Sequence, residues 1–250
     1  MKFGRLMVAG ALWLAGMTMT AHAQSPEESR AEIPSMVRGA FDSAYGKALV
    51  AELGKSLRKD ADPACLTAKG IAPDQLEQRG RDLLIKWSEK LWLTLNDFID
   101  PKVYEEKFAA TAGRGASAEL KRLRNDPVVK KSLELERPIR QASILDATFE
   151  QFDRYMLVKR IKLTAVSPLG TANEALLKMN PTEAAESAVD KYTAANKSAA
   201  LTRFAKLSQQ SLAASGAATK LEQVAKTGPL EFLNGIEADL AELCIGPEKK

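Results

Sequence analysis

Prolines directly follow helix-capping residues at five points along the chain, and this pattern constrains the fold more than any other. The pairs are Asp62-Pro63, Asp100-Pro101, Asp126-Pro127, Ser167-Pro168 and Asn180-Pro181. An aspartate, serine or asparagine at the cap, with proline in the first turn, is typical of a helix start. We find no alternating apolar and polar runs bounded by Asn-Gly or Asp-Gly turns, which would indicate hairpins. The sequence therefore predicts an all-α protein, a bundle of about eight or nine helices.

Apolar residues recur every three or four positions between these start points, so the helix ranges can be predicted. The first helix is expected as one continuous segment, and Pro138 is expected to begin a new helix. The predicted ranges are about Pro34–Lys59, Pro73–Ile99, Pro101–Ala112, Glu119–Arg124, Val128–Glu136, Pro138–Leu163 and Pro229–Cys244.

The Gly113-Arg114-Gly115 segment is the best predicted boundary between two lobes. Residues 24–113 would form an aromatic-rich lobe, and residues 116–250 a lobe that is first basic and then rich in alanine and serine. A single helical domain over residues 24–250 is the alternative.

The first residues have the pattern of a cleavable export signal. Lys2 and Arg5 precede an apolar run, and Ala21-His22-Ala23 supplies small residues before Gln24. The run is shorter than the roughly 20 residues that cross a bilayer, which disfavours the alternative of a membrane anchor. We expect residues 1–23 to be a signal peptide and residues 24–250 to be soluble, periplasmic or secreted, and without a transmembrane anchor.

Two cysteines, Cys65 and Cys244, are present in the chain. In an oxidising compartment an even number of cysteines usually forms a bridge, so we expect one long-range disulfide between them. Two separately buried thiols are the alternative. A redox-active pair is disfavoured because the two residues lack the Cys-x-x-Cys spacing.

The single histidine, His22, lies inside the predicted signal. The mature chain would therefore lack the commonest general base and the commonest metal ligand. Catalytic triads and histidine-ligated zinc are excluded, and Asp60-Ala61-Asp62 lacks the rest of a calcium loop. We expect no metal and no cofactor.

Carboxylates are then the most plentiful acid–base groups. Glu183, Glu186 and Asp190 lie at helical spacing on one face. A carboxylate-dependent hydrolase of a cell-envelope glycan would need one such group with a raised pKa. The alternative interpretation is a solvated helix face supported by turn-spaced ion pairs.

Residues 114–162 form the most basic stretch, and its expected contacts with an anionic partner are Lys121, Arg122, Arg124, Lys130 and Lys131. In the periplasm such a partner would be a lipid headgroup, lipopolysaccharide or a peptidoglycan carboxylate. A solvated face is again the alternative. Loss of Lys2 and Arg5 with the signal lowers the formal charge from +4 to about +2, which argues against nucleic acid. We therefore expect an exported helical protein that acts by binding an envelope protein, lipid or glycan; the glycan hydrolase is the alternative.

Overall fold

A computed structural model describes residues 26–97, 99–158, 174–216 and 235–246. Within these ranges all regular secondary structure is helical, and the predicted all-α bundle is confirmed. The predicted signal peptide and the Ser167-Pro168 start lie outside the described residues. The helices are α2 (Pro26–Asp42), α3 (Ala44–Asp60), α4 (Pro63–Ala68), α5 (Gln75–Asp97), α6 (Pro101–Ala112), α7 (Ala116–Arg124), α8 (Pro127–Val158), α9 (Glu174–Met179), α10 (Thr182–Asn196), α11 (Ala199–Ser215) and α13 (Ile236–Glu242).

Three of the predicted proline starts begin helices α4, α6 and α8, with aspartate as the cap. The Oδ1 atom of Asp100 accepts hydrogen bonds from the backbone N–H groups of Lys102 and Val103, at 2.9 and 3.1 Å. Asp62 and Asp126 cap α4 and α8 in the same way. These side chains satisfy donors that have no partner inside the helix, which is why the local sequence is enough to locate the start.

The prediction of one helix over Pro34–Lys59 is wrong, because the chain breaks at Ser43 into α2 and α3. The Ser43 hydroxyl donates to the Ala40 carbonyl at 2.7 Å and accepts from the Gly46 N–H at 3.0 Å, so it closes α2 and caps α3. Pro34 lies inside α2, which already begins at Pro26. The apolar repeat continues through the break, since Val37 and Phe41 of α2 and Tyr45 and Leu49 of α3 are all buried.

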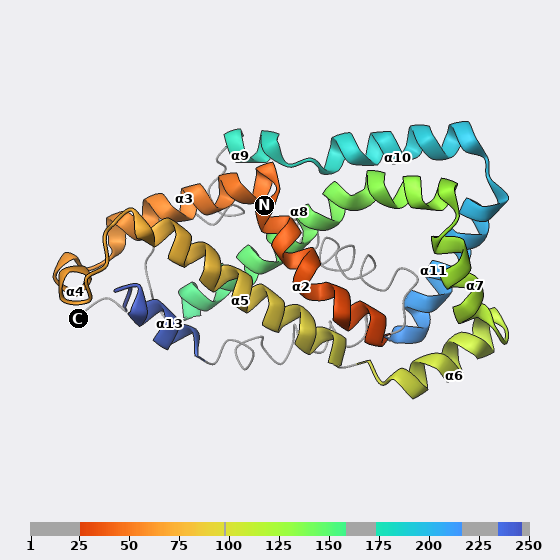
Figure 1. The fold of residues 1–250 in the computed structure, drawn as a ribbon, viewed down its shortest axis with the longest axis horizontal. Helices are drawn as coiled ribbons and strands as arrows, with labels where there is room; N and C mark the ends of the chain where they lie inside the picture. The colour runs from red at the N-terminus through yellow and green to blue at the C-terminus, as the bar shows by residue number, and fades with distance from the viewer. Residues whose placement is uncertain (1–25, 98, 159–173, 217–234, 247–250) are drawn as a thin grey trace, which may run out of the picture.

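The prediction that Pro138 begins a helix is also wrong, since Pro138 lies inside the 32-residue helix α8. Proline lacks the N–H that would donate to the carbonyl of Glu134 and usually bends a helix. Figure 1 shows that α8 changes direction along its length. The Nη2 atom of Arg140 donates to the neighbouring Leu133 carbonyl at 2.7 Å, which supplies a donor next to the interrupted turn.

The buried apolar side chains form two clusters. The first lies between α2, α3, α5, the second half of α8 and α13, and includes Phe41, Trp87 and Phe149. The second joins α6, α7, the start of α8 and α11 through Phe108, Leu120 and other side chains. Figure 1 shows α4 and α13 at one end of the molecule and α6, α7 and α11 at the other. Side-chain packing thus joins α6 to α7 across Gly113–Gly115, and a division into lobes at that segment stays a prediction.

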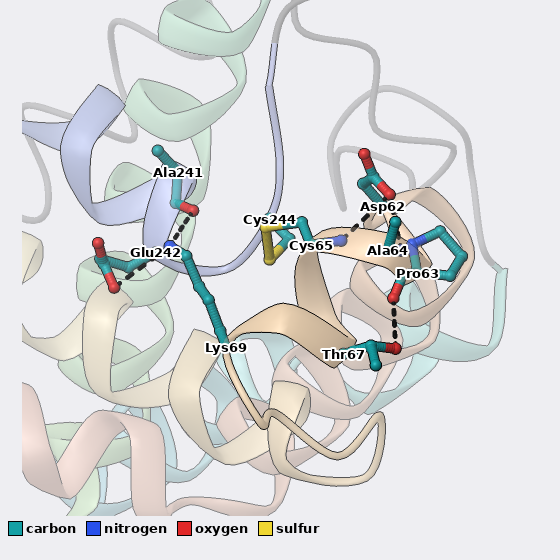
Figure 2. The surroundings of a disulfide bond; sticks show 9 residues. All are labelled: Asp62, Pro63, Ala64, Cys65, Thr67, Lys69, Ala241, Glu242 and Cys244. Atoms are coloured by element: carbon teal, nitrogen blue, oxygen red, sulfur yellow. Dashed lines mark hydrogen bonds and ion pairs between the residues drawn. A yellow bond between two sulfur atoms is a disulfide. The ribbon is translucent and has the colours of Figure 1, made fainter.

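Cys65 and Cys244 form the expected disulfide, which joins α4 to the residues after α13. The Asp62 N–H donates to the Cys244 carbonyl at 3.0 Å, beside the bridge. Figure 2 shows Lys69 extended toward Ala241 and Glu242, where its Nζ lies 2.8 Å from the Ala241 carbonyl oxygen and 3.4 Å from the Glu242 carboxylate. The disulfide therefore lies within a set of polar contacts that hold the C-terminal segment on the bundle.

Among the described residues, every helix is too short or too polar to cross a bilayer.

Candidate functional site

A hollow of about 620 Å³ lies between α2, α7 and α8, and we call it the cationic groove. Five basic side chains line it: Lys121, Arg124, Lys130, Arg137 and Arg140. Three carboxylates, those of Glu28, Glu32 and Glu134, face the same space. The remaining lining residues are Ala31, Asn125 and Leu133. The cationic groove therefore has an excess of positive charge, and nine of its eleven lining residues are polar or charged.

A second hollow of about 320 Å³ adjoins the cationic groove toward the middle of α2 and α8. The two hollows share Glu32, Arg124, Leu133, Arg137 and Arg140, and we call these five residues the shared edge. The second hollow adds Ser35, Gly39 and Gln141, which are polar or small, and the apolar residues Met36 and Ile144. The arginines of the shared edge are thus accessible from two sides.

Helix geometry brings these cations together. Lys130, Glu134 and Arg137 are spaced by four and three residues on α8, so they lie on one face of that helix. Helix α8 begins at Pro127 and continues past Pro138, which keeps this face aligned with Arg140 one turn later. Helix α7 ends just before α8 and places Arg124 beside them.

Two of the five cations are paired with carboxylates of α2. The Lys121 Nζ lies 2.5 Å from Glu28, and the Arg124 Nη2 lies 3.1 Å from Glu32. The side chains of Lys130 and Arg137 are exposed and make no hydrogen bond or ion pair with the described parts of the chain. These two side chains are therefore available to a ligand.

The charges near Arg140 influence one another. Burial lowers the pKa of Arg140, Arg124 and Arg137 lower it further, and Glu136 and Glu32 oppose the shift. Burial has the opposite effect on the acid Glu136: it raises the pKa of this carboxyl, and the positive charge of Arg140 opposes the rise. Arg140, Arg124 and Arg137 carry three positive charges against the two negative charges of Glu136 and Glu32. The net charge of this group is positive, so an added anion would be stabilised there.

The structure brings together three of the five residues expected to contact an anion. Lys121, Arg124 and Lys130 line the cationic groove, whereas Arg122 and Lys131 do not, and Lys131 instead pairs with Glu134 at 3.2 Å. Sequence reasoning missed Glu28, Glu32, Arg137 and Arg140 as lining residues. The spacing of seven residues between Lys130 and Arg137 could have indicated that the two side chains share one helix face. This signal was missed because a new helix was expected to start at Pro138, which would have ended that face.

Asp146 is the described carboxyl that comes nearest to what a hydrolase would need. It is partly buried on α8, and its Oδ1 accepts a hydrogen bond from the Tyr45 hydroxyl at 2.9 Å. Burial raises the pKa of Asp146 to about 6, with Glu150 adding to the shift and the hydrogen bonds from Tyr45 and Asn180 opposing it. Asn180 donates to the other oxygen at 3.5 Å. Both oxygens are therefore held by neighbours, and Asp146 lines neither of the two hollows.

The acidic face predicted on residues 183–190 lies on α10. Glu183, Glu186 and Asp190 are all exposed there. Across the described ranges, no three side chains of histidine, cysteine, aspartate or glutamate converge as metal ligands would.

No protein-family model, curated protein or solved structure in our comparisons matches this chain.

Proposed function

We propose that this protein is exported to the periplasm or beyond and binds an anionic envelope partner through the cationic groove, without catalysing a reaction. The export part of the proposal rests on the signal pattern in residues 1–23. The binding part rests on one observation: the lining has five cations against three carboxylates, and Lys130 and Arg137 have no protein partner among the described residues.

The composition of the lining favours binding of a charged group over other uses of a hollow. Specific ligand pockets are usually rich in apolar and aromatic surface, whereas this one has only Ala31 and Leu133 as apolar residues. A neutral sugar would find no aromatic ring to stack on in this lining. Charge-assisted hydrogen bonds to lysine and arginine are what the cationic groove offers.

The test is co-sedimentation of the mature protein with vesicles of phosphatidylglycerol, vesicles of phosphatidylcholine, and isolated cell wall. We expect it to bind phosphatidylglycerol vesicles, isolated cell wall or both at low salt and to be released by high salt. It should not bind phosphatidylcholine vesicles. Lys130→Gln should weaken the binding. Lys102→Gln is the matched control, because Lys102 is exposed on α6 and lies outside the cationic groove. Equal binding by both variants, or no binding to either anionic material, contradicts the proposal.

The second candidate function is a carboxylate-dependent hydrolase of a cell-envelope glycan, and the raised pKa of Asp146 is the observation in its favour. Turnover of isolated cell wall that disappears in Asp146→Asn would establish it. Asp190→Asn is the matched control, since Asp190 is exposed on α10. Under our proposal, the wild-type protein releases no glycan fragments.

A further inference from the structure

Three guanidinium groups and one carboxylate meet at the shared edge of the two hollows. Arg124 comes from α7, Arg137 and Arg140 come from α8, and Glu32 comes from α2. Three positive charges thus face one negative charge in the lining, and Glu136, whose charge affects Arg140 more than that of Glu32 does, lowers the excess to one positive charge. Glu136 itself lines neither hollow and accepts a hydrogen bond from Ser132.

Two of these guanidinium groups are already held in position. The Nη2 atom of Arg140 donates to the Leu133 carbonyl beside the interrupted turn at Pro138, and Arg124 donates to both oxygens of Glu32, at 3.1 and 3.4 Å. Holding a long side chain in place before a ligand arrives reduces the entropy lost on binding. Arg137 has no such tie among the described residues, so it is the group that would close on the ligand.

The chemistry of these groups selects a particular kind of anion. A guanidinium group donates through a planar fork that suits phosphate and carboxylate oxygens, and several forks around one site suit a tetrahedral oxyanion. A phosphate monoester carries about −1.5 to −2 charges near neutral pH, so it would neutralise the excess positive charge at the shared edge. Most of the other lining residues of the cationic groove end in polar or charged groups, among them Asn125, Lys121 and Glu134, which can hydrogen-bond to a polar group attached to the phosphate.

On the basis of the proposed function, we infer that the shared edge binds the phosphate monoester of a sugar-like molecule, and that Glu32 competes with this phosphate for Arg124. The carboxylate of Glu32 is an internal anion that keeps the site occupied in the absence of ligand. Its removal should therefore strengthen binding, whereas removal of Arg137 should weaken it.

The experiment titrates the mature protein with inorganic phosphate, glucose 1-phosphate and glucuronate at constant ionic strength, using calorimetry. We expect saturable binding of glucose 1-phosphate, and glucuronate should bind at least about tenfold more weakly. Vesicles of phosphatidic acid form a further arm, which presents the same phosphate on a lipid. A higher affinity for the vesicles than for the sugar phosphate contradicts the inferred sugar-like body.

Two pairs of variants separate a built site from general charge. Arg137→Gln should weaken binding of glucose 1-phosphate about tenfold, and Arg122→Gln, which removes the same charge from an exposed position outside the groove, should leave it unchanged. Glu32→Gln should strengthen binding severalfold. Glu27→Gln is its control, since Glu27 is exposed on α2 and lines neither hollow.

The outcomes distinguish this inference from the proposed function. If Lys130→Gln weakens binding to vesicles or cell wall but glucose 1-phosphate does not bind, the phosphate inference is wrong and the anion-binding function stands. The same conclusion follows if Arg137→Gln and Arg122→Gln have equal effects on glucose 1-phosphate. If neither Lys130→Gln nor Arg137→Gln changes any binding, both proposals are wrong. Thermal unfolding of each variant checks that its fold is intact.

Discussion

A Cβ atom on Gly46 would lie 2.8 Å from the Cα atom of Phe41, so α3 leaves the Ser43 break in close backbone contact with α2. The atoms in the way belong to the backbone and have little freedom to move aside. Gly46→Ala should therefore lower the free energy of unfolding by about 1–3 kcal/mol, despite the better helix propensity of alanine. Chemical denaturation measures this.

Gly39 on α2 provides the control for this substitution. A Cβ atom there would meet only the Nε2 atom of Gln141, at 3.4 Å. Gly39→Ala should leave the stability unchanged or raise it by up to about 1 kcal/mol. Equal stability of the two alanine variants would show that the crossing of α2 and α3 does not depend on glycine.

The Cys65–Cys244 disulfide closes a loop with a sequence separation of 179 residues. Cross-linking residues so far apart restricts the unfolded chain, and its removal should cost roughly 3–5 kcal/mol in the chain-entropy account. The double variant Cys65→Ser with Cys244→Ser should melt well below the wild type, and a reductant should lower the Tm of the wild type alone. Detection of two reactive thiols in natively purified protein would contradict the bridge.

Asp239 holds α13 independently of the disulfide. Its carboxylate accepts hydrogen bonds from Lys86 Nζ at 2.9 Å and from Trp87 Nε1 at 3.0 Å. Burial acts to raise the pKa of Asp239, but these donors outweigh it and the pKa is lowered. We expect limited proteolysis near α13 to be rapid only when Asp239→Ala is combined with a reductant. Equally rapid cleavage of the reduced wild type would show that the disulfide is the only tie.

The Asp146 carboxyl should make stability depend on pH. Because burial raises its folded-state pKa to about 6, above the ordinary value of 3.8, the folded protein binds this proton more tightly than the unfolded chain. The contribution is fully present below about pH 4 and is lost as pH rises through about 6, a change of about 2–3 kcal/mol.

Asp146→Asn tests this contribution by removing the titration while keeping an oxygen that accepts from Tyr45. Between about pH 4 and pH 7 the free energy of unfolding of the wild type should fall, and the variant should lack this fall. At neutral pH the variant should be at least as stable as the wild type. Asp190→Asn, exposed on α10, should follow the wild-type curve. Parallel curves for Asp146→Asn and the wild type would contradict the raised pKa. Urea denaturation at a series of pH values provides the measurement.

Local chemistry made part of the fold predictable from the sequence. Asp62, Asp100 and Asp126 cap their helices through bonds to residues two or three positions later, so a short stretch of sequence contains the whole signal. The disulfide was predictable because there are only two cysteines to pair. The break at Ser43 was not, because the apolar repeat runs through it without interruption.

The site was only half predictable for a similar reason. The basic residues of α7 and α8 stand out in the sequence, but the carboxylates that face them come from α2. Lys121 and Glu28 are 93 positions apart, and Arg124 and Glu32 are 92 apart, so no local pattern connects them. At Pro138 the expectation that proline begins a helix was wrong, because α8 continues through this residue and packs against α2 and α10.

The central claim is that the cationic groove, and not the general charge of the basic stretch, binds the anionic partner. The most direct test compares two double variants that each lose two positive charges, Lys130→Gln with Arg137→Gln inside the groove and Lys102→Gln with Arg122→Gln outside it. In low-salt co-sedimentation with the anionic material that the wild type binds, the first should lose at least about tenfold in affinity, and the second should stay within about twofold of the wild type. Equal losses in the two double variants would contradict the account.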